Sequence, residues 1–194
     1  MININNILNA NEVLTGVVRE TPVLFSEEMN KASGVNLFLK AECNQINGSF
    51  KTRGAYFAMH QYFKENKKKD VVAFSSGNHA QGVAYAASLM GVKATIVMPE
   101  DTPMIKIEKT QALGAKVVFY NRYKESRQAI AKKIASDTAA FLIQANVNFV
   151  LYPVQEQPAL EAKHKLLLLE NKLNNLTVPV GGDLLLFTFS SPRN

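Results

Sequence analysis

A lysine that could carry out covalent chemistry lies in the segment Gly48–Ala55, which reads GSFKTRGA. Lys51 follows Phe50 and stands where a helix is expected to begin, because Ser49 belongs to the residue types that favour the N-cap position. A lysine amine attacks an aldehyde only when it is unprotonated, and both a helix dipole and exclusion from water favour that form. Most lysines are exposed, so this segment alone would indicate only a surface lysine.

A second segment, Ser75–Gly82, reads SSGNHAQG and favours the chemical interpretation of Lys51. It directly follows the short apolar run Val71–Phe74 and precedes a predicted helix. Ligands of open parallel sheets bind beyond the carboxyl ends of the strands, and the amide groups at a helix start bind anions. The two segments together predict a lysine that forms a Schiff base beside an anion-binding turn.

The middle of the chain must position these segments, and its pattern is that of a parallel α/β sheet. Apolar strands alternate with amphipathic helices, which predicts parallel pairing with right-handed crossovers and a three-layer α/β fold. The expected strands are Val71–Phe74, Ala94–Met98 and Lys116–Tyr120, and the expected helices are Lys51–Lys64, Ala80–Met90, Glu125–Thr138 and one from Thr102, as N-cap, to Gly114. Flanking elements are expected as helices at Ile7–Val18 and Ala159–Leu173 and as strands at Val35–Lys40, Phe149–Tyr152 and Thr177–Val180.

Composition and charge narrow the classes of function that this chain could have. The 194 residues are 47% hydrophobic and 20% charged, which predicts a folded chain with a real core. The net charge of +6 comes from lysines that are dispersed, so nucleic-acid binding is the poorer interpretation. Neither a signal peptide nor a membrane-length apolar run is recognised, and the single cysteine, Cys43, fits a reducing compartment, so we expect a cytoplasmic protein. Cys43 is expected to be a buried, packed side chain.

The two segments and the motifs around them resemble the serine/threonine dehydratase family of pyridoxal-phosphate enzymes. The resemblance runs from about Glu20 to Gly182, with the motifs in the expected order. It rests on Glu42, Gln45, Gly48–Lys51, Arg53–Ala55, Ser75–Gly82, Ala94–Pro99, Leu113–Val118 and Val178–Gly182. It implies a fold of the tryptophan-synthase-beta-like type, in which residues 1–53 and 149–194 form an incomplete large cofactor-binding domain and residues 54–148 form a small α/β domain.

The resemblance also implies roles for individual residues. Lys51 would form the Schiff base with pyridoxal 5'-phosphate, and the freed amine would move the substrate's α-proton. Phe50 would lie against the pyridine ring, Asn78 would bond the ring hydroxyl oxygen, and Gly181 and Gly182 would contribute to phosphate binding. The substrate carboxylate would be held by Ser75, Ser76, Gly77 and Asn78. No metal ligand is expected among the residues present.

The implied reaction removes ammonia from a β-hydroxy amino acid and gives a 2-oxo acid. Threonine, serine and 3-hydroxyaspartate are all open as substrates. Ser76 is the residue found in serine racemases and hydroxyaspartate ammonia-lyases, where a hydroxyl on the face opposite Lys51 could exchange a proton and allow racemisation. A β-replacing synthase of the O-acetylserine type is a weaker alternative. A homo-oligomer is expected if the protein is intact.

The chain departs from the family pattern near its end. The family has a run of four glycines followed by leucine, whereas this sequence has Gly181–Gly182 followed by Asp183 and ends at Asn194. A carboxylate at that position would repel a phosphate dianion in a dry site. Lys163–Leu166 also replaces the usual Gly-Gln-Gly-Thr. These departures suggest a C-terminally truncated or frame-disrupted dehydratase, and a non-catalytic remnant or interaction fragment is the alternative function.

Overall fold

The structure is a computed structural model, and it describes residues 4–144, 152–168, 175–177 and 188–191. The chain divides into two compact units, one formed by Met1–Phe50 with Tyr152–Asn194 and the other by Lys51–Leu151. The boundary at the second unit's start falls immediately before Lys51. Each unit is considered by itself.

The second unit contains a sheet of four parallel strands in the order β5-β4-β3-β6. The strands are β3 (Val71–Phe74), β4 (Ala94–Pro99), β5 (Lys116–Tyr120) and β6 (Phe141–Ile143). The register pairs Phe74 with Val97, so β3 and β4 run side by side to the edge where Ser75 follows. The predicted parallel α/β sheet is therefore confirmed, and β6 is a strand that the sequence pattern did not indicate.

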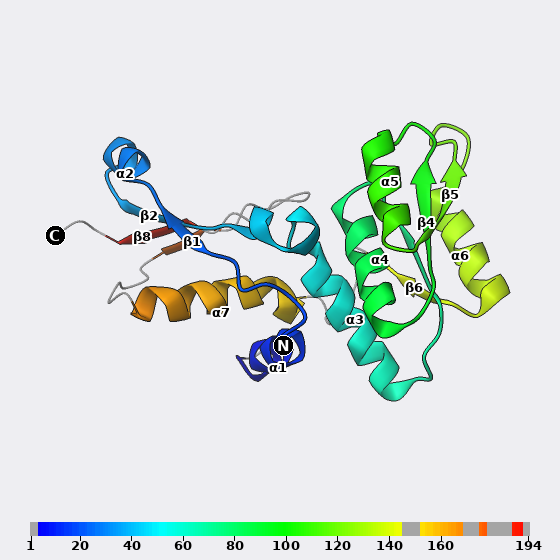
Figure 1. Ribbon diagram of the computed structural model, residues 1–194, viewed down its shortest axis with the longest axis horizontal. Helices are drawn as coiled ribbons and strands as arrows, with labels where there is room; N and C mark the ends of the chain where they lie inside the picture. Colours follow the sequence, from blue (N-terminus) through cyan, green and yellow to red (C-terminus); the bar gives the residue numbers. More distant parts are fainter. Residues whose placement is uncertain (1–3, 145–151, 169–174, 178–187, 192–194) are drawn as a thin grey trace. The chain divides into compact units, whose positions relative to one another are not determined.

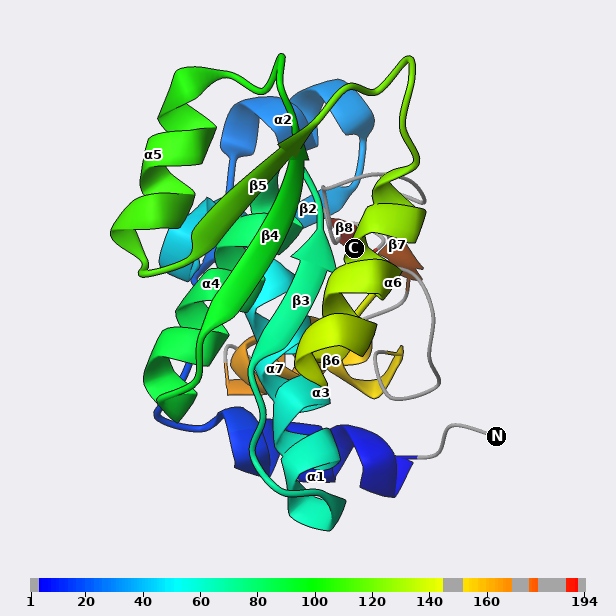
Figure 2. The same cartoon turned by 90° about the vertical axis from the view of Figure 1, so that its right-hand side faces the viewer.

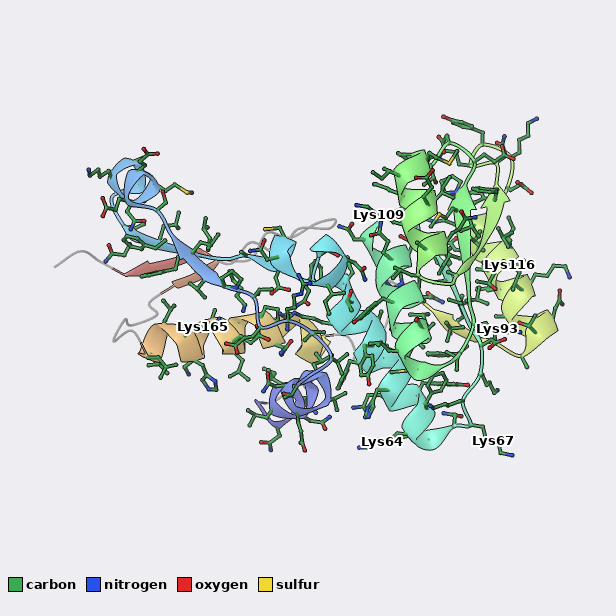
Figure 3. All side chains as sticks on the ribbon, viewed as in Figure 1. Lys64, Lys67, Lys93, Lys109, Lys116 and Lys165 are labelled. Atoms are coloured by element: carbon green, nitrogen blue, oxygen red, sulfur yellow. The ribbon has the colours of Figure 1, made fainter. Side chains whose placement is uncertain are left out.

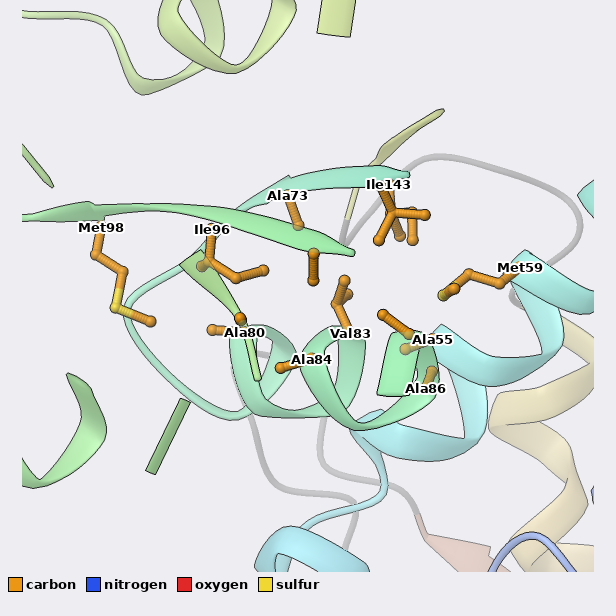
Figure 4. Packing of buried hydrophobic residues seen from close by; sticks show 14 of the residues in the cluster. Ala55, Met59, Ala73, Ala80, Val83, Ala84, Ala86, Ile96, Met98 and Ile143 are labelled. Atoms are coloured by element: carbon orange, nitrogen blue, oxygen red, sulfur yellow. The ribbon is translucent and has the colours of Figure 1, made fainter. Parts of the chain in front are cut away.

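Helices cover both faces of this sheet, as Figure 2 shows. They are α3 (Lys51–Glu65), α4 (Asn78–Met90), α5 (Met104–Ala112) and α6 (Arg127–Thr138). Alternate residues of β3 point to opposite faces: Val71 and Ala73 pack in the cluster formed with α3, α4 and α5, whereas Val72 packs in the cluster that contains Ala131 of α6. Figure 4 shows the first cluster, in which alanines of α4 lie close beneath the strands.

The ends of two helices test predictions that were made from single residues, one as a helix stop and one as a helix cap. Gly91 ends α4 with a left-handed φ of 69°, a conformation that glycine adopts without strain, so this predicted stop is confirmed. Thr102, in contrast, does not cap α5. Its hydroxyl donates a hydrogen bond to the Pro99 carbonyl oxygen at 2.7 Å, and Pro103 occupies the N-cap position. The threonine closes the turn after β4 instead, and α5 begins two residues later at Met104.

The described part of the first unit contains a four-stranded antiparallel sheet in the order β1-β2-β8-β7. Its strands are β1 (Val23–Phe25), β2 (Asn36–Lys40), β7 (Asn175–Thr177) and β8 (Thr188–Ser191), and its helices are α1 (Ile4–Leu14), α2 (Glu27–Ser33), α7 (Tyr152–Leu168) and two short 3-10 turns at Glu42–Asn44 and Ile46–Gly48. In Figure 1 the colours show that β2 and β8, which come from opposite ends of the chain, are neighbours. The parallel arrangement thus holds for the second unit, and the described strands of the first unit differ from it.

A buried ion pair joins the two halves of the first unit. Lys40 Nζ at the end of β2 lies 2.5 Å from Glu161 Oε2 in α7, and neither side chain is more than 9% exposed. Gln157, one turn earlier in α7, donates to Glu161 Oε1 at 2.7 Å. Tyr152 begins α7 instead of ending the expected strand, whose other residues, 149–151, lie outside the described residues.

Two further observations concern the surface. No helix in the described parts of the chain has the length and apolar character needed to span a membrane. In Figure 3 the labelled lysines of the second unit, Lys64, Lys67, Lys93, Lys109 and Lys116, are spread around it and do not gather on one face.

Candidate active site

Lys51 is the first residue of α3 and is partly buried. The chain reaches it through two consecutive residues with left-handed backbone, Asn47 at φ 64° and Gly48 at φ 72°. Glycine adopts this region freely and asparagine tolerates it, which explains these residue types in the turn. These two residue types therefore suit the backbone conformation of the turn that precedes Phe50.

Ser49 does not cap α3, and this corrects the prediction from its residue type. The residue is 4% exposed, and its hydroxyl makes no hydrogen bond among the described residues. Phe50 stands between Ser49 and the helix, so the serine is one position too early for the cap geometry that a helix start requires. A buried hydroxyl without a partner costs free energy, and such groups in folded proteins call for an explanation.

The turn Ser75–Gly77 lies at the carboxyl end of β3, where a parallel sheet binds its ligands. The Ser75 amide donates to the Val97 carbonyl oxygen at 3.1 Å, which ties the turn to β4. The Ser75 hydroxyl accepts a hydrogen bond from the Gly77 amide at 3.2 Å. Ser75 to Asn78 are all partly buried. These contacts give the turn a fixed shape at the edge of the sheet.

Helix α4 begins at Asn78 and has no side-chain cap. Gly77 occupies the N-cap position, and its carbonyl oxygen accepts hydrogen bonds from the amides of Ala80 and Gln81. A helix of 13 residues places a partial positive charge at this end, and backbone amides there can bind a carboxylate. His79, the next residue, is buried at 6% exposure, as expected for a structural histidine.

Gly82 brings α4 against the start of α3. A Cβ atom on Gly82 would lie 2.9 Å from the Lys51 carbonyl carbon and 3.0 Å from both the Lys51 oxygen and the Thr52 nitrogen. Asn78 and Gly82 are four residues apart in one helix and so share a face. The structure therefore brings the Lys51 backbone against α4 at Gly82, one turn after Asn78 on the same face of that helix.

The other residues singled out from the sequence have separate outcomes. Gly181 and Gly182, predicted to contribute to phosphate binding, lie outside the described residues, as does Asp183. Phe50 is buried at 8% exposure and directly precedes Lys51. Cys43, expected to be packed, is exposed, because it lies in the short turn Glu42–Asn44 where only Glu42 is buried. Among the described residues, no three His, Cys, Asp or Glu side chains form a group that could hold a metal ion.

Comparison with known proteins identifies the family. Residues 14–189 match the model of the family described as "Pyridoxal-phosphate dependent enzyme". The chain belongs to this family. It is 40% identical over 186 residues to L-threo-3-hydroxyaspartate ammonia-lyase of Saccharomyces cerevisiae, covering 93% of this chain and 54% of the yeast protein. It is 41% identical over 143 residues to L-threonine ammonia-lyase of Thermotoga maritima, covering 74% of this chain and 36% of that protein.

The solved structure of maize serine racemase has the same fold. The two superpose with a TM-score of 0.80 at 34% sequence identity, covering 84% of this chain and 50% of the maize chain. The predicted fold and the predicted pyridoxal-phosphate cofactor of the family are confirmed. The chain spans about half the length of the relatives that it matches.

The described residues fit the substrate side of a pyridoxal-phosphate site. The Lys51 backbone contacts α4 at Gly82, one turn after the start of that helix, where no side chain caps the amides and a carboxylate could bind. The close approach at Gly82 leaves the two helices no room for a side chain between them, so the lysine's backbone has one position relative to α4. The sequence motifs pointed to Lys51 and to the turn, and the contact that joins them was not predicted.

Proposed function

We propose that the protein is a pyridoxal-phosphate-dependent ammonia-lyase that acts on a β-hydroxy amino acid. The observation that carries the proposal is the contact between Lys51, at the start of α3, and α4, whose uncapped start follows the Ser75–Gly77 turn. This contact supports the proposal because the backbone of the proposed cofactor lysine and the helix that would bind the substrate carboxylate meet within the second unit. The relatives, which are ammonia-lyases and a serine racemase, support the same class of chemistry.

The residues of this chain then have separate tasks. The Lys51 amine holds the cofactor covalently, and once released it takes the proton from the substrate's α-carbon. The Ser75–Asn78 segment would bind the substrate carboxylate, and Asn78 would bond the ring hydroxyl oxygen. Phe50 would pack against the ring, and Gly181 and Gly182 would contribute to phosphate binding. When bound, the cofactor supplies an electron-withdrawing ring that accepts the electron pair left on the α-carbon.

Hydroxyaspartate, threonine and serine are the candidate substrates. These three substrates are suggested by the names of relatives of this chain. The described residues favour none of the three over the others. Ser76 favours racemisation of serine as a second activity, since it is partly buried in the turn before Asn78 and carries a hydroxyl that could exchange a proton. Formation of D-serine from L-serine beside 2-oxo acid would distinguish racemisation from elimination alone.

The test is covalent binding of the cofactor at Lys51. Protein incubated with pyridoxal phosphate is expected to show the visible absorption of a lysine-bound cofactor, and borohydride should then fix the label on the peptide that contains Lys51. Lys51→Ala should lose both signals. Lys64→Ala is the matched control, because Lys64 is an exposed lysine near the far end of the same helix (Figure 3), and it should retain them.

Assays on the same purified protein distinguish the ammonia-lyase from the alternative functions. Production of 2-oxo acid and ammonia from the three hydroxy amino acids supports the ammonia-lyase, whereas β-replacement with sulfide would indicate a synthase. A chain that folds but neither absorbs nor labels would indicate a non-catalytic remnant and contradict the proposal. A homo-oligomer and a cytoplasmic location remain predictions, the latter resting on the single cysteine of the chain.

A further inference from the structure

Gly82 is a glycine inside a helix, and its environment explains why no other residue fits there. Its φ is not in the left-handed region, so the backbone would accept any L-residue. Alanine is the better helix former, and glycine in a helix interior lowers stability unless something else requires it. The requirement at Gly82 is therefore one of space and not of backbone conformation.

The atoms that fill this space belong to the backbone at Lys51. An added Cβ would lie 2.9 Å from the Lys51 carbonyl carbon, a separation that real Cβ atoms essentially never show, and 3.0 Å from the Thr52 nitrogen, which is tighter than most real Cβ contacts. A long side chain could rotate away from such a contact, but a peptide group cannot. An alanine at position 82 must therefore push the first turn of α3 away from α4.

Small residues also lie one turn further along each helix. Ala55 of α3 and Ala86 of α4 are buried in the same cluster, at 1% and 0% exposure. Both are labelled in Figure 4. These small side chains let the two helices pack closely, as Gly82 does at Lys51.

We propose that Gly82 is the positioning residue for Lys51. The proposal rests on the function proposed above, in which Lys51 carries the cofactor and the Ser75–Asn78 segment holds the substrate carboxylate. Asn78 lies one turn before Gly82 on the same face of α4, so the Gly82 contact sets how far the Lys51 backbone stands from the anion-binding end of that helix. A misplacement of about 1 Å in such a site lowers reaction rates by roughly 100-fold.

The test compares Gly82→Ala with Val83→Ala. Val83 is fully buried in α4 and points toward the strands in Figure 4, so its truncation should destabilise the fold without moving Lys51. Each variant is assayed by urea unfolding, by the rate at which pyridoxal phosphate becomes fixable by borohydride at Lys51, and by the pH dependence of the bound cofactor's absorption. None of these measurements depends on turnover.

Gly82→Ala is expected to remain folded, to label Lys51 roughly 10- to 100-fold more slowly and to shift the pH profile. Val83→Ala should unfold at lower urea concentration and yet label Lys51 at the wild-type rate with the wild-type profile. If Gly82→Ala is unstable, the measurement is repeated in trimethylamine N-oxide, which favours the compact state.

Labelling of Gly82→Ala within twofold of wild type, with an unchanged pH profile, would overturn the proposal. Failure of this variant to fold even in the osmolyte would also overturn it, since the glycine would then serve folding alone. If the wild-type protein itself does not label at Lys51, it is the proposed function that fails, and the two failures are therefore distinguishable.

Discussion

At the scale of single residues, the sequence indicated that Lys51 could react but not which residues fix the position of its backbone. Lys51 at a helix start followed from the residue types around it, and the structure begins α3 at that residue. Ser49 was read as the cap from its residue type, yet its hydroxyl has no partner among the described residues. The contact between Gly82 and Lys51 joins residues 31 positions apart, and periodicity contains no information about such a distance.

The turn before Lys51 gives a prediction at this scale. Gly48 has φ 72°, where an L-residue with a Cβ is strained by about 1–2 kcal/mol. Gly48→Ala should therefore lower the free energy of unfolding by that amount, measured by urea titration.

Asn47→Gly is the matched control for Gly48→Ala. Asn47 has nearly the same φ, 64°, and glycine accepts this conformation, so Asn47→Gly adds no backbone strain and any loss of stability there measures the contacts of the asparagine side chain. An equal loss in both variants would show that side-chain contacts of the turn, and not its backbone conformation, determine the effect.

At the scale of elements, prediction succeeded where the signal is local. Strands β3, β4 and β5 were found because each is a short apolar run, and Gly91 was found as a helix stop because the left-handed C-cap favours glycine. Thr102 was misread because a threonine hydroxyl can bond the preceding carbonyl as readily as a helix amide. Strand β6, three residues long, is too short for alternation to be recognised.

The C-terminal end of helix α6 offers a substitution that should raise the stability of the protein. Its C-cap residue is Ala139, at φ 54°, where the structure holds an alanine in the conformation that usually selects glycine. Ala139→Gly should relieve this strain and raise the free energy of unfolding by about 0.5–1 kcal/mol after the entropy that glycine adds to the unfolded chain is subtracted. Urea titration or the thermal midpoint would measure the gain.

Ala140→Gly, at the neighbouring position, is the control for this substitution. Ala140 does not have a positive φ and packs against the cluster around Ala131. The same chemical change should therefore destabilise the protein there. Stabilisation at both positions would contradict the assignment of strain to Ala139.

At the scale of the whole molecule, the two units differed in how far they could be predicted. In the second unit β3, β4 and β5 are consecutive in sequence and adjacent in the sheet, so a local pattern was enough to predict them, whereas β6 returns to pair with β3. In the first unit β2 pairs with β8, about 150 residues later, and the antiparallel sheet therefore depends on pairings that no local pattern encodes. The family resemblance supplied the division of the chain, and the composition alone did not.

The buried pair Lys40–Glu161 tests whether the two distant parts of the first unit stabilise each other. Removing one partner would leave a buried charge, so Lys40→Met should lower the free energy of unfolding by about 3–5 kcal/mol. The double variant Lys40→Met/Glu161→Leu removes both charges and fills the space with apolar groups, and it should recover most of that loss. Urea unfolding of wild type, both single variants and the double variant gives the coupling free energy directly. If the double variant loses the sum of the single losses, β2 and α7 do not depend on this pair, and the antiparallel sheet and the apolar contacts around Phe38 and Leu166 must hold the first unit together instead.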